Sequence, residues 1–68
     1  MSLRETAEYK ALDPYTATGL AEGFIEADSE EQVLCAWQYI HDQGMTAYLQ
    51  GFFGRTCRDL IEGGAIDA

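Results

Sequence analysis

The chain is poor in cationic side chains. Four Lys and Arg residues stand against twelve Asp and Glu residues, which gives a formal net charge of −8 at pH 7. Eight of the acids fall within residues 1–31, and five of these crowd into residues 22–31. Such a surface repels phosphate, so direct nucleic-acid binding is unfavourable without a basic patch. It suits a basic partner protein, although most acidic runs are solvated faces that aid solubility.

Cysteine and histidine are also scarce, which argues against several kinds of chemistry. The two cysteines, Cys35 and Cys57, form neither a disulfide framework nor a zinc-binding pattern, and both fall on apolar stripes where free thiols are buried. The single histidine, His41, has no nucleophile or orienting group around it in the sequence. The acids lack the spacing of a calcium loop. We therefore predict a non-enzymatic chain without a metal or cofactor.

Long hydrophobic runs are missing as well. No apolar run approaches the ~18 residues of a membrane span, and no basic segment followed by an apolar one marks a signal peptide. These absences and the free thiols predict a cytoplasmic protein without a membrane partner. With 68 residues the chain is one domain at most, with a marginal core and little room for a pocket of ~300 Å³ or more. Self-association is the expected source of additional stability, so we predict a homodimer.

Helical periodicity and capping residues predict a small all-α fold of three helices. Residues 1–12 carry a thin apolar stripe and are expected to form a weakly ordered N-terminal arm, and residues 13–68 to form a single domain. Asp13 followed by Pro14 is typical of a helix start, so the first helix is expected at about 14–27. Its spacing puts Leu20, Ala21, Phe24 and Ile25 on one helical face.

The second and third helices are predicted to form a helical hairpin. Ser29 and Gln32 read as a capping box that opens a helix at about 30–43, and Gly44 sits where a left-handed residue ends one. A broad apolar stripe then predicts a helix at about 45–62. The stripe consists of Met45, Tyr48, Leu49, Phe52, Phe53, Cys57, Leu60 and Ile61. Because almost no loop separates the two helices, they form a hairpin that the first helix closes.

Two glycines inside the predicted third helix leave three interpretations open. The one we favour is that Gly51 and Gly54 let another backbone approach closely. A second is that the helix breaks there. A third is that Gly54, Arg55 and Thr56 begin a new helix whose free N–H groups bind an anion, although a phosphate loop would need more glycines and a preceding strand.

Arg55 and Arg58 are the only cations after Lys10. One interpretation pairs them with nearby carboxylates, and another stacks Arg55 on Phe52 or Tyr48 in a cation–π contact. A third gives Arg55 a role in partner binding, because arginine and aromatic residues are common interface anchors. The candidate interaction residues are Arg55, Arg58, Trp37, Tyr48, Phe52 and Phe53, with Gly51 and Gly54 as close-packing glycines.

Residues 30–66 contain four short segments with a recognisable order of Trp, Gln, Gly and Arg. The segments are Ala36-Trp37-Gln38-Tyr39-Ile40, Asp42-x-Gly44, Leu49-Gln50-Gly51-x-x-Gly54-Arg55-Thr56 and Leu60-Ile61-Glu62-x-Gly64-x-Ile66. Together they resemble a functionally uncharacterised family of small proteins encoded in tailed-bacteriophage genomes. The chain departs from the family pattern at Gln43, where Thr is usual, and at Cys57, where a small residue is usual. The resemblance implies a phage origin and a defined structural or binding task for Arg55.

These observations favour a non-enzymatic phage accessory protein that acts by protein–protein interaction in the host bacterial cytoplasm. Its expected partners are a second copy of itself and a basic host protein, whose activity it would modulate. Two alternatives stay open. The third helix could serve a helix-turn-helix-like nucleic-acid regulator, or the chain could be a minor virion or assembly component.

Overall fold

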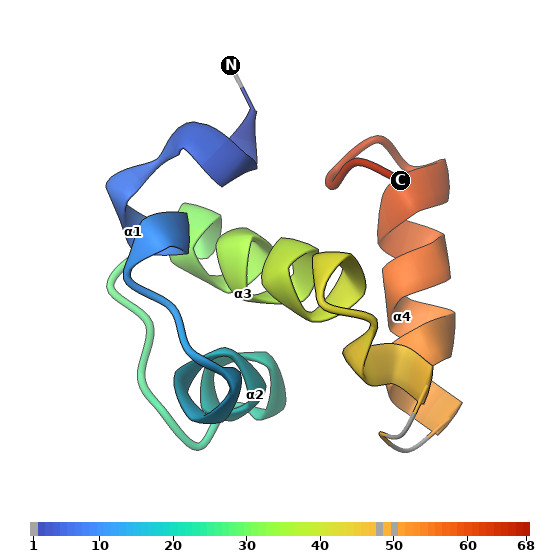
Figure 1. The fold of residues 1–68 in the computed structure, drawn as a ribbon, viewed down its shortest axis with the longest axis horizontal. Helices are drawn as coiled ribbons and strands as arrows, with labels where there is room; N and C mark the ends of the chain where they lie inside the picture. Colours follow the sequence, from blue (N-terminus) through green and yellow to red (C-terminus); the bar gives the residue numbers. More distant parts are fainter. Residues whose placement is uncertain (1, 48, 50) are drawn as a thin grey trace.

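The computed structural model describes residues 2–47, 49 and 51–68. All regular structure in these residues is helical, which confirms the predicted all-α class. The elements are, in order, the 3₁₀ helix η1 (Leu3–Glu5), α1 (Ala7–Lys10), α2 (Pro14–Glu22), α3 (Glu30–Asp42), the 3₁₀ helix η2 (Met45–Ala47) and α4 (Gly51–Glu62). Figure 1 shows α3 in the middle, with the N-terminal segment on one side, α2 on the other and α4 across its C-terminal end. None of the described helices is long and apolar enough to cross a membrane.

The start of α2 is confirmed, but its predicted end is wrong. The Asp13 carboxylate accepts a hydrogen bond from the Thr16 N–H at 2.7 Å, and Pro14 occupies the first turn. The helix ends at Glu22 rather than at residue 27, because Gly23 adopts the left-handed conformation with φ of 86°. A glycine takes this conformation without steric cost and turns the chain out of the helix.

The start of α3 is also confirmed, and its end lies within one residue of the prediction. Ser29 Oγ accepts a hydrogen bond from the Gln32 N–H at 3.2 Å. The Gln32 side chain reaches back and accepts from the Asp28 N–H at 2.6 Å, one residue earlier than in a standard capping box. Gly44 has φ of 68°, so the left-handed residue after the helix is where the pattern indicated.

The predicted helix at 45–62 is wrong in its first part. Met45–Ala47 form the 3₁₀ helix η2, and α4 begins only at Gly51. Tyr48 and Gln50, which the continuous helix would have included, lie outside the described residues. The described part of the fold has four α-helices instead of the predicted three, and the additional one is α1 in the N-terminal segment. Figure 1 shows α4 running across the end of α3 rather than alongside it.

The N-terminal residues contact the helical domain. In the structure η1 and α1 pack against α3, whereas the sequence-based prediction set residues 1–12 apart as an arm. Leu3 and Leu12 lie against the hydrophobic core, which gives this segment an apolar attachment that its thin stripe did not reveal. Ser2 and Thr6 accept hydrogen bonds from the N–H groups of the two short helices, as N-caps do.

Side chains from α2, α3, α4 and the C-terminal residues form one hydrophobic core. Its buried members are Ala17, Leu20, Ala36, Trp37, Ile40, Met45, Phe53, Cys57 and Ile66. Trp37 joins α3 to α4, with its ring centroid 5.5 Å from that of Phe53 and 6.2 Å from that of Phe52. Cys35 and Cys57 are buried free thiols, as predicted, and burial raises the pKa of Cys57.

Among the described residues, the glycine with a close neighbour is Gly19 rather than Gly51 or Gly54. A Cβ on Gly54 would meet no described heavy atom within 4 Å, and the described atom nearest to one on Gly51 is in the Arg55 guanidinium, at 3.3 Å. Within the described residues, no other backbone therefore approaches these two positions. A Cβ on Gly19 would lie 2.5 Å from Cδ1 of Ile25, a separation that real side chains do not reach.

Candidate functional site

An apolar groove of about 530 Å³ opens between α2 and the segment that leads into α4. The residues from α2 that line it are Pro14, Tyr15, Thr18, Gly19 and Glu22. Phe24 and Ile25 follow them from the loop, and the other described residues of the lining are Met45 and Leu49. We call this surface the groove. Its size contradicts the expectation that so short a chain has little room for a pocket of ~300 Å³ or more.

The groove exists because the chain turns sharply at Gly23. After this turn the Ile25 N–H donates a hydrogen bond to the Gly19 carbonyl at 3.1 Å. The Ile25 side chain occupies the space that a side chain at position 19 would fill. The buried Met45 adds a flexible thioether to the lining. A glycine at position 19 and a left-handed residue at position 23 are thus the two local requirements for the groove.

Exposed aromatic side chains gather at the groove. Tyr15 is 78% exposed and Phe24 is 84% exposed, and both line it. Among the described residues, the only other exposed large hydrophobic side chain is Phe52, at 38%. The sequence placed Phe24 on the apolar face of a helix that was expected to reach residue 27, and this prediction is wrong because α2 ends at Glu22. Aromatic surface left in water beside an apolar groove is typical of a binding site.

The charge at the groove is acidic. Glu22 is the one charged residue among the described residues that line it, and the exposed Glu26 follows directly after Ile25. Further along, Asp28, Glu30 and Glu31 are exposed as well. A partner that enters the groove therefore meets an apolar surface with carboxylates beside it.

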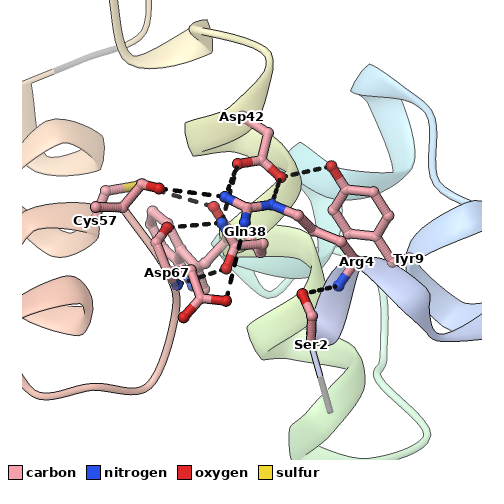
Figure 2. Close-up of polar contacts among 9 residues, drawn as sticks. Ser2, Arg4, Tyr9, Gln38, Asp42, Cys57 and Asp67 are labelled. Carbon is pink, nitrogen blue, oxygen red and sulfur yellow. Dashed lines mark hydrogen bonds and ion pairs between the residues drawn. The ribbon is translucent and has the colours of Figure 1, made fainter.

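A second cluster, polar rather than apolar, joins both terminal segments to α3. It consists of Arg4, Tyr9, Gln38, Asp42 and Asp67, and we call it the polar cluster (Figure 2). Arg4 donates to both carboxylate oxygens of Asp42, from Nε at 2.8 Å and from Nη2 at 2.7 Å. The Tyr9 hydroxyl donates to the same carboxylate at 2.7 Å. The fork-to-fork pairing of guanidinium and carboxylate is the strong, directional form of an ion pair.

Gln38 is the centre of the polar cluster and is fully buried. Its amide nitrogen donates to Asp42 at 3.0 Å and to the Asp67 carbonyl at 2.9 Å. Its amide oxygen accepts from the Asp67 N–H at 2.7 Å. Both donors and the acceptor of the side chain are thus occupied, as a buried amide requires. Gln38 holds the C-terminal residues beside α3 in the way that Asp42 holds the N-terminal ones.

The polar cluster stabilises the charged form of Asp42 and the neutral form of Tyr9. The Arg4 hydrogen bonds, followed by those of Tyr9 and Gln38, hold the pKa of Asp42 below its usual value, against the opposing effect of burial. Burial, and then the bond to Asp42, raise the pKa of Tyr9 to about 12. Asp42 is therefore charged and Tyr9 neutral throughout the physiological range. A general acid or base needs a pKa near the working pH, so this cluster suits attachment rather than proton transfer.

The candidate interaction residues do not form one surface. Trp37 and Phe53 are core side chains, 6% and 1% exposed, so a partner cannot reach them in the folded chain. Phe52, Arg55 and Arg58 are exposed on α4. Tyr48 lies outside the described residues. None of these six positions is among the described residues that line the groove.

Two interpretations of the α4 arginines find no basis in the described residues. Arg55 and Arg58 form no ion pair there, because both ion pairs involve Arg4. The anion site fails for a different reason. It required a helix to begin at Gly54, whereas α4 begins at Gly51 and Arg55 lies inside it.

Comparison of the chain with protein-family models, with curated proteins and with solved structures finds no match. The resemblance to phage proteins therefore stays a prediction. Within the described residues, no group of three His, Cys, Asp or Glu side chains is placed to hold a metal ion. The groove and the polar cluster are thus the two features on which a function can be argued.

Proposed function

We propose that this chain is a protein-interaction module whose groove binds a segment of a basic partner protein. The observation that carries the proposal is the exposure of Tyr15 and Phe24 beside an apolar groove that also contains Glu22. Burying two exposed aromatic rings against a partner removes a large apolar area from water, and aromatic residues are frequent interface anchors. Glu22 favours a partner with positive charge.

The groove is better suited to binding than to catalysis. Its described lining offers one carboxylate, a threonine and a tyrosine amid apolar side chains. Catalysis by a nucleophile needs a base in hydrogen-bond reach and a group that orients it. Thr18 instead donates its hydroxyl hydrogen bond to the Pro14 carbonyl of its own helix, at 2.8 Å. This supports the non-enzymatic function expected from the sequence.

We further propose that the module acts in the cytoplasm of a phage-infected bacterium, where the partner is a host protein. This part of the proposal depends on the sequence resemblance alone. The homodimer, the nucleic-acid regulator and the virion component stay predictions. Among them, a dimer through the groove is disfavoured, because it brings two acidic surfaces together in a chain whose net charge is −8.

Site-specific photo-crosslinking in the source cells tests the proposal. The crosslinking amino acid p-benzoylphenylalanine replaces Phe24, whose side chain is 84% exposed and is therefore free to change without disturbing the core. The matched control places the same group at Glu62, an exposed position at the end of α4. We expect a discrete covalent product from position 24 that position 62 does not form. Identical products from both positions, or none from either, would refute the proposed function.

A further inference from the structure

We infer that the segment bound in the groove is a basic amphipathic helix, which inserts apolar side chains beside Tyr15 and Phe24 and pairs a Lys or Arg with Glu22. This inference rests on the proposed function and names the chemistry of the partner. It follows from three properties of the groove, namely the nature of its walls, its volume and the sign of its charge.

The walls favour a helix over an extended strand. Strand addition needs an exposed sheet edge with free backbone N–H and C=O groups, and the described residues contain no strand. On the α2 side, the backbone of Pro14–Glu22 is already engaged in a helix. A partner therefore gains little from backbone hydrogen bonds and must bind through side chains. An amphipathic helix presents its apolar side chains along one face, which is the arrangement that a groove between helices accepts.

The volume and lining favour several aliphatic side chains. About 530 Å³ falls within the ~300–1,000 Å³ of sites that enclose most of a drug-sized ligand, so it accepts more than one large residue. Ile25, Met45 and Leu49 give the groove an aliphatic lining, and methionine adapts its shape to different neighbours. Tyr15 and Phe24 lie exposed at the groove, where they can close over an inserted side chain.

The charge selects a basic helix over an acidic one or a second copy of this chain. Glu22 lines the groove, Glu26 is exposed one residue beyond Ile25, and no Lys or Arg is among the described lining residues. The polar face of an amphipathic helix borders its apolar face. Lys or Arg residues on that border therefore come next to the Glu22 carboxylate when the apolar face is buried. Their attraction also speeds association at low salt.

The test uses designed peptides and purified protein. The first peptide carries Leu on one helical face and Lys on the other, the second replaces every Lys with Glu, and the third has the composition of the first in an order without a helical face. A fourth, proline-rich peptide with the same number of Lys residues tests recognition of an extended ligand. Binding is followed by fluorescence anisotropy at low and at high salt. At low salt we expect the first peptide to bind more tightly than the acidic one, because the carboxylates at the groove repel the latter. At high salt, where screening weakens the general attraction of the chain for any cationic peptide, we expect the first peptide to bind more tightly than the disordered and proline-rich ones.

Variants of the chain locate the binding. Phe24→Ala is expected to weaken the first peptide about tenfold, as loss of an aromatic anchor does, and Glu22→Gln to weaken it about threefold and to reduce its salt dependence. The matched controls Phe52→Ala and Glu62→Gln lie outside the groove and are expected to change the affinity less than about twofold. Circular dichroism confirms that each variant is folded. Equal losses in groove and control variants would overturn the inference.

The remaining outcomes separate the inference from the proposed function. If the acidic peptide binds as well as the first one at low salt, or the disordered or proline-rich peptide does so at high salt, the inference of a helical and basic partner is wrong. If the Phe24 crosslink captures a partner through an acidic or extended segment, the inference fails and the interaction module stands. If sedimentation shows a dimer that Phe24→Ala dissociates, the occupant is a second copy and the inference is again wrong. If neither crosslink nor peptide binding depends on position 24, both fail.

Discussion

In the polar cluster every strong hydrogen-bonding group that is withdrawn from water meets a partner, whereas the groove leaves two aromatic rings in contact with water. Gln38 is fully buried and fully paired, and within the described residues no buried side-chain nitrogen or oxygen lacks a hydrogen bond. Phe24, in contrast, is 84% exposed. In Figure 1 the two terminal segments lie on one side of α3 and α2 lies on the other. This difference is the reason why we propose a stabilising role for the first region and a binding role for the second.

The largest expected effect is the loss of stability on replacing Gln38. Gln38→Leu leaves the Asp67 N–H and C=O without partners, so we expect a loss of about 2 kcal/mol in the free energy of unfolding. Domains of this size have only about 3–10 kcal/mol in total, so thermal unfolding measures the change readily. The exposed Gln43, one residue past the end of α3, provides the control Gln43→Leu. An equal loss in both variants would mean that the hydrogen bonds of Gln38 contribute nothing specific.

Asp42 makes the polar cluster sensitive to acid. Because the folded chain holds the pKa of Asp42 below its unfolded value, this stabilisation is complete above pH ~4 and is lost as the pH falls through the folded pKa. Asp42→Asn removes this stabilisation at every pH, and we expect the free energy of unfolding at pH 7 to fall by about 1–2 kcal/mol. The difference in urea unfolding between the two proteins should shrink below pH ~4. A difference that does not change with pH would contradict this assignment.

The groove depends on the contact between Gly19 and Ile25. In the intact chain Gly19→Ala gains about 1 kcal/mol of helix propensity but must displace the Ile25 side chain, at a cost of about 1–3 kcal/mol. In an Ile25→Ala background there is no large side chain to displace, so Gly19→Ala keeps only the gain in helix propensity. A double-mutant cycle should therefore show a coupling of about 1–2 kcal/mol. Additive effects of the two substitutions would show that this contact does not form in solution.

The smallest effect is expected at Gly54, where no contact among the described residues offsets the cost of a glycine. Gly54→Ala should stabilise α4 by about 0.5–1 kcal/mol, because alanine restricts the unfolded chain and its methyl group meets none of the described residues within 4 Å. The melting temperature measures the change. The opposite effect is expected if the other backbone predicted to approach this glycine belongs to a second copy of the chain, since a methyl group would then weaken a dimer. Destabilisation that depends on protein concentration would favour that dimer.

The starts of α2 and α3 could be predicted from the sequence because capping is local. Asp13 and Ser29 each lie within three residues of the N–H group that they bind. The end of α2 could not be predicted in the same way. Phe24 and Ile25 continue the helical spacing of the apolar residues before them. The apolar pattern therefore gives no sign that Gly23 adopts the left-handed conformation and ends the helix. The conformation of one glycine overrides the periodicity of its neighbours.

The candidate site was harder to predict than the helices, for two physical reasons. An apolar pattern does not separate side chains that fill a core from those that stay exposed. Trp37 and Phe53 were therefore predicted as interaction residues although they are buried, and Phe24 was not predicted as one although it is exposed. The polar cluster is long-range, since Arg4 and Asp42 are 38 positions apart. Spacing along the chain carries no signal for such a pair. Only the fold brings the N-terminal segment, α3 and the C-terminal residues together.

The most direct test of the binding role of the groove is a nuclear magnetic resonance titration of the labelled chain with the Leu/Lys amphipathic peptide. We predict that the amide signals of Thr18, Gly19, Glu22 and Phe24 shift on addition of the peptide, and that those of Gln38, Asp42 and Asp67 stay unchanged. Shifts centred on Arg55 and Arg58, on the polar cluster, or spread evenly over every acidic residue would contradict the account.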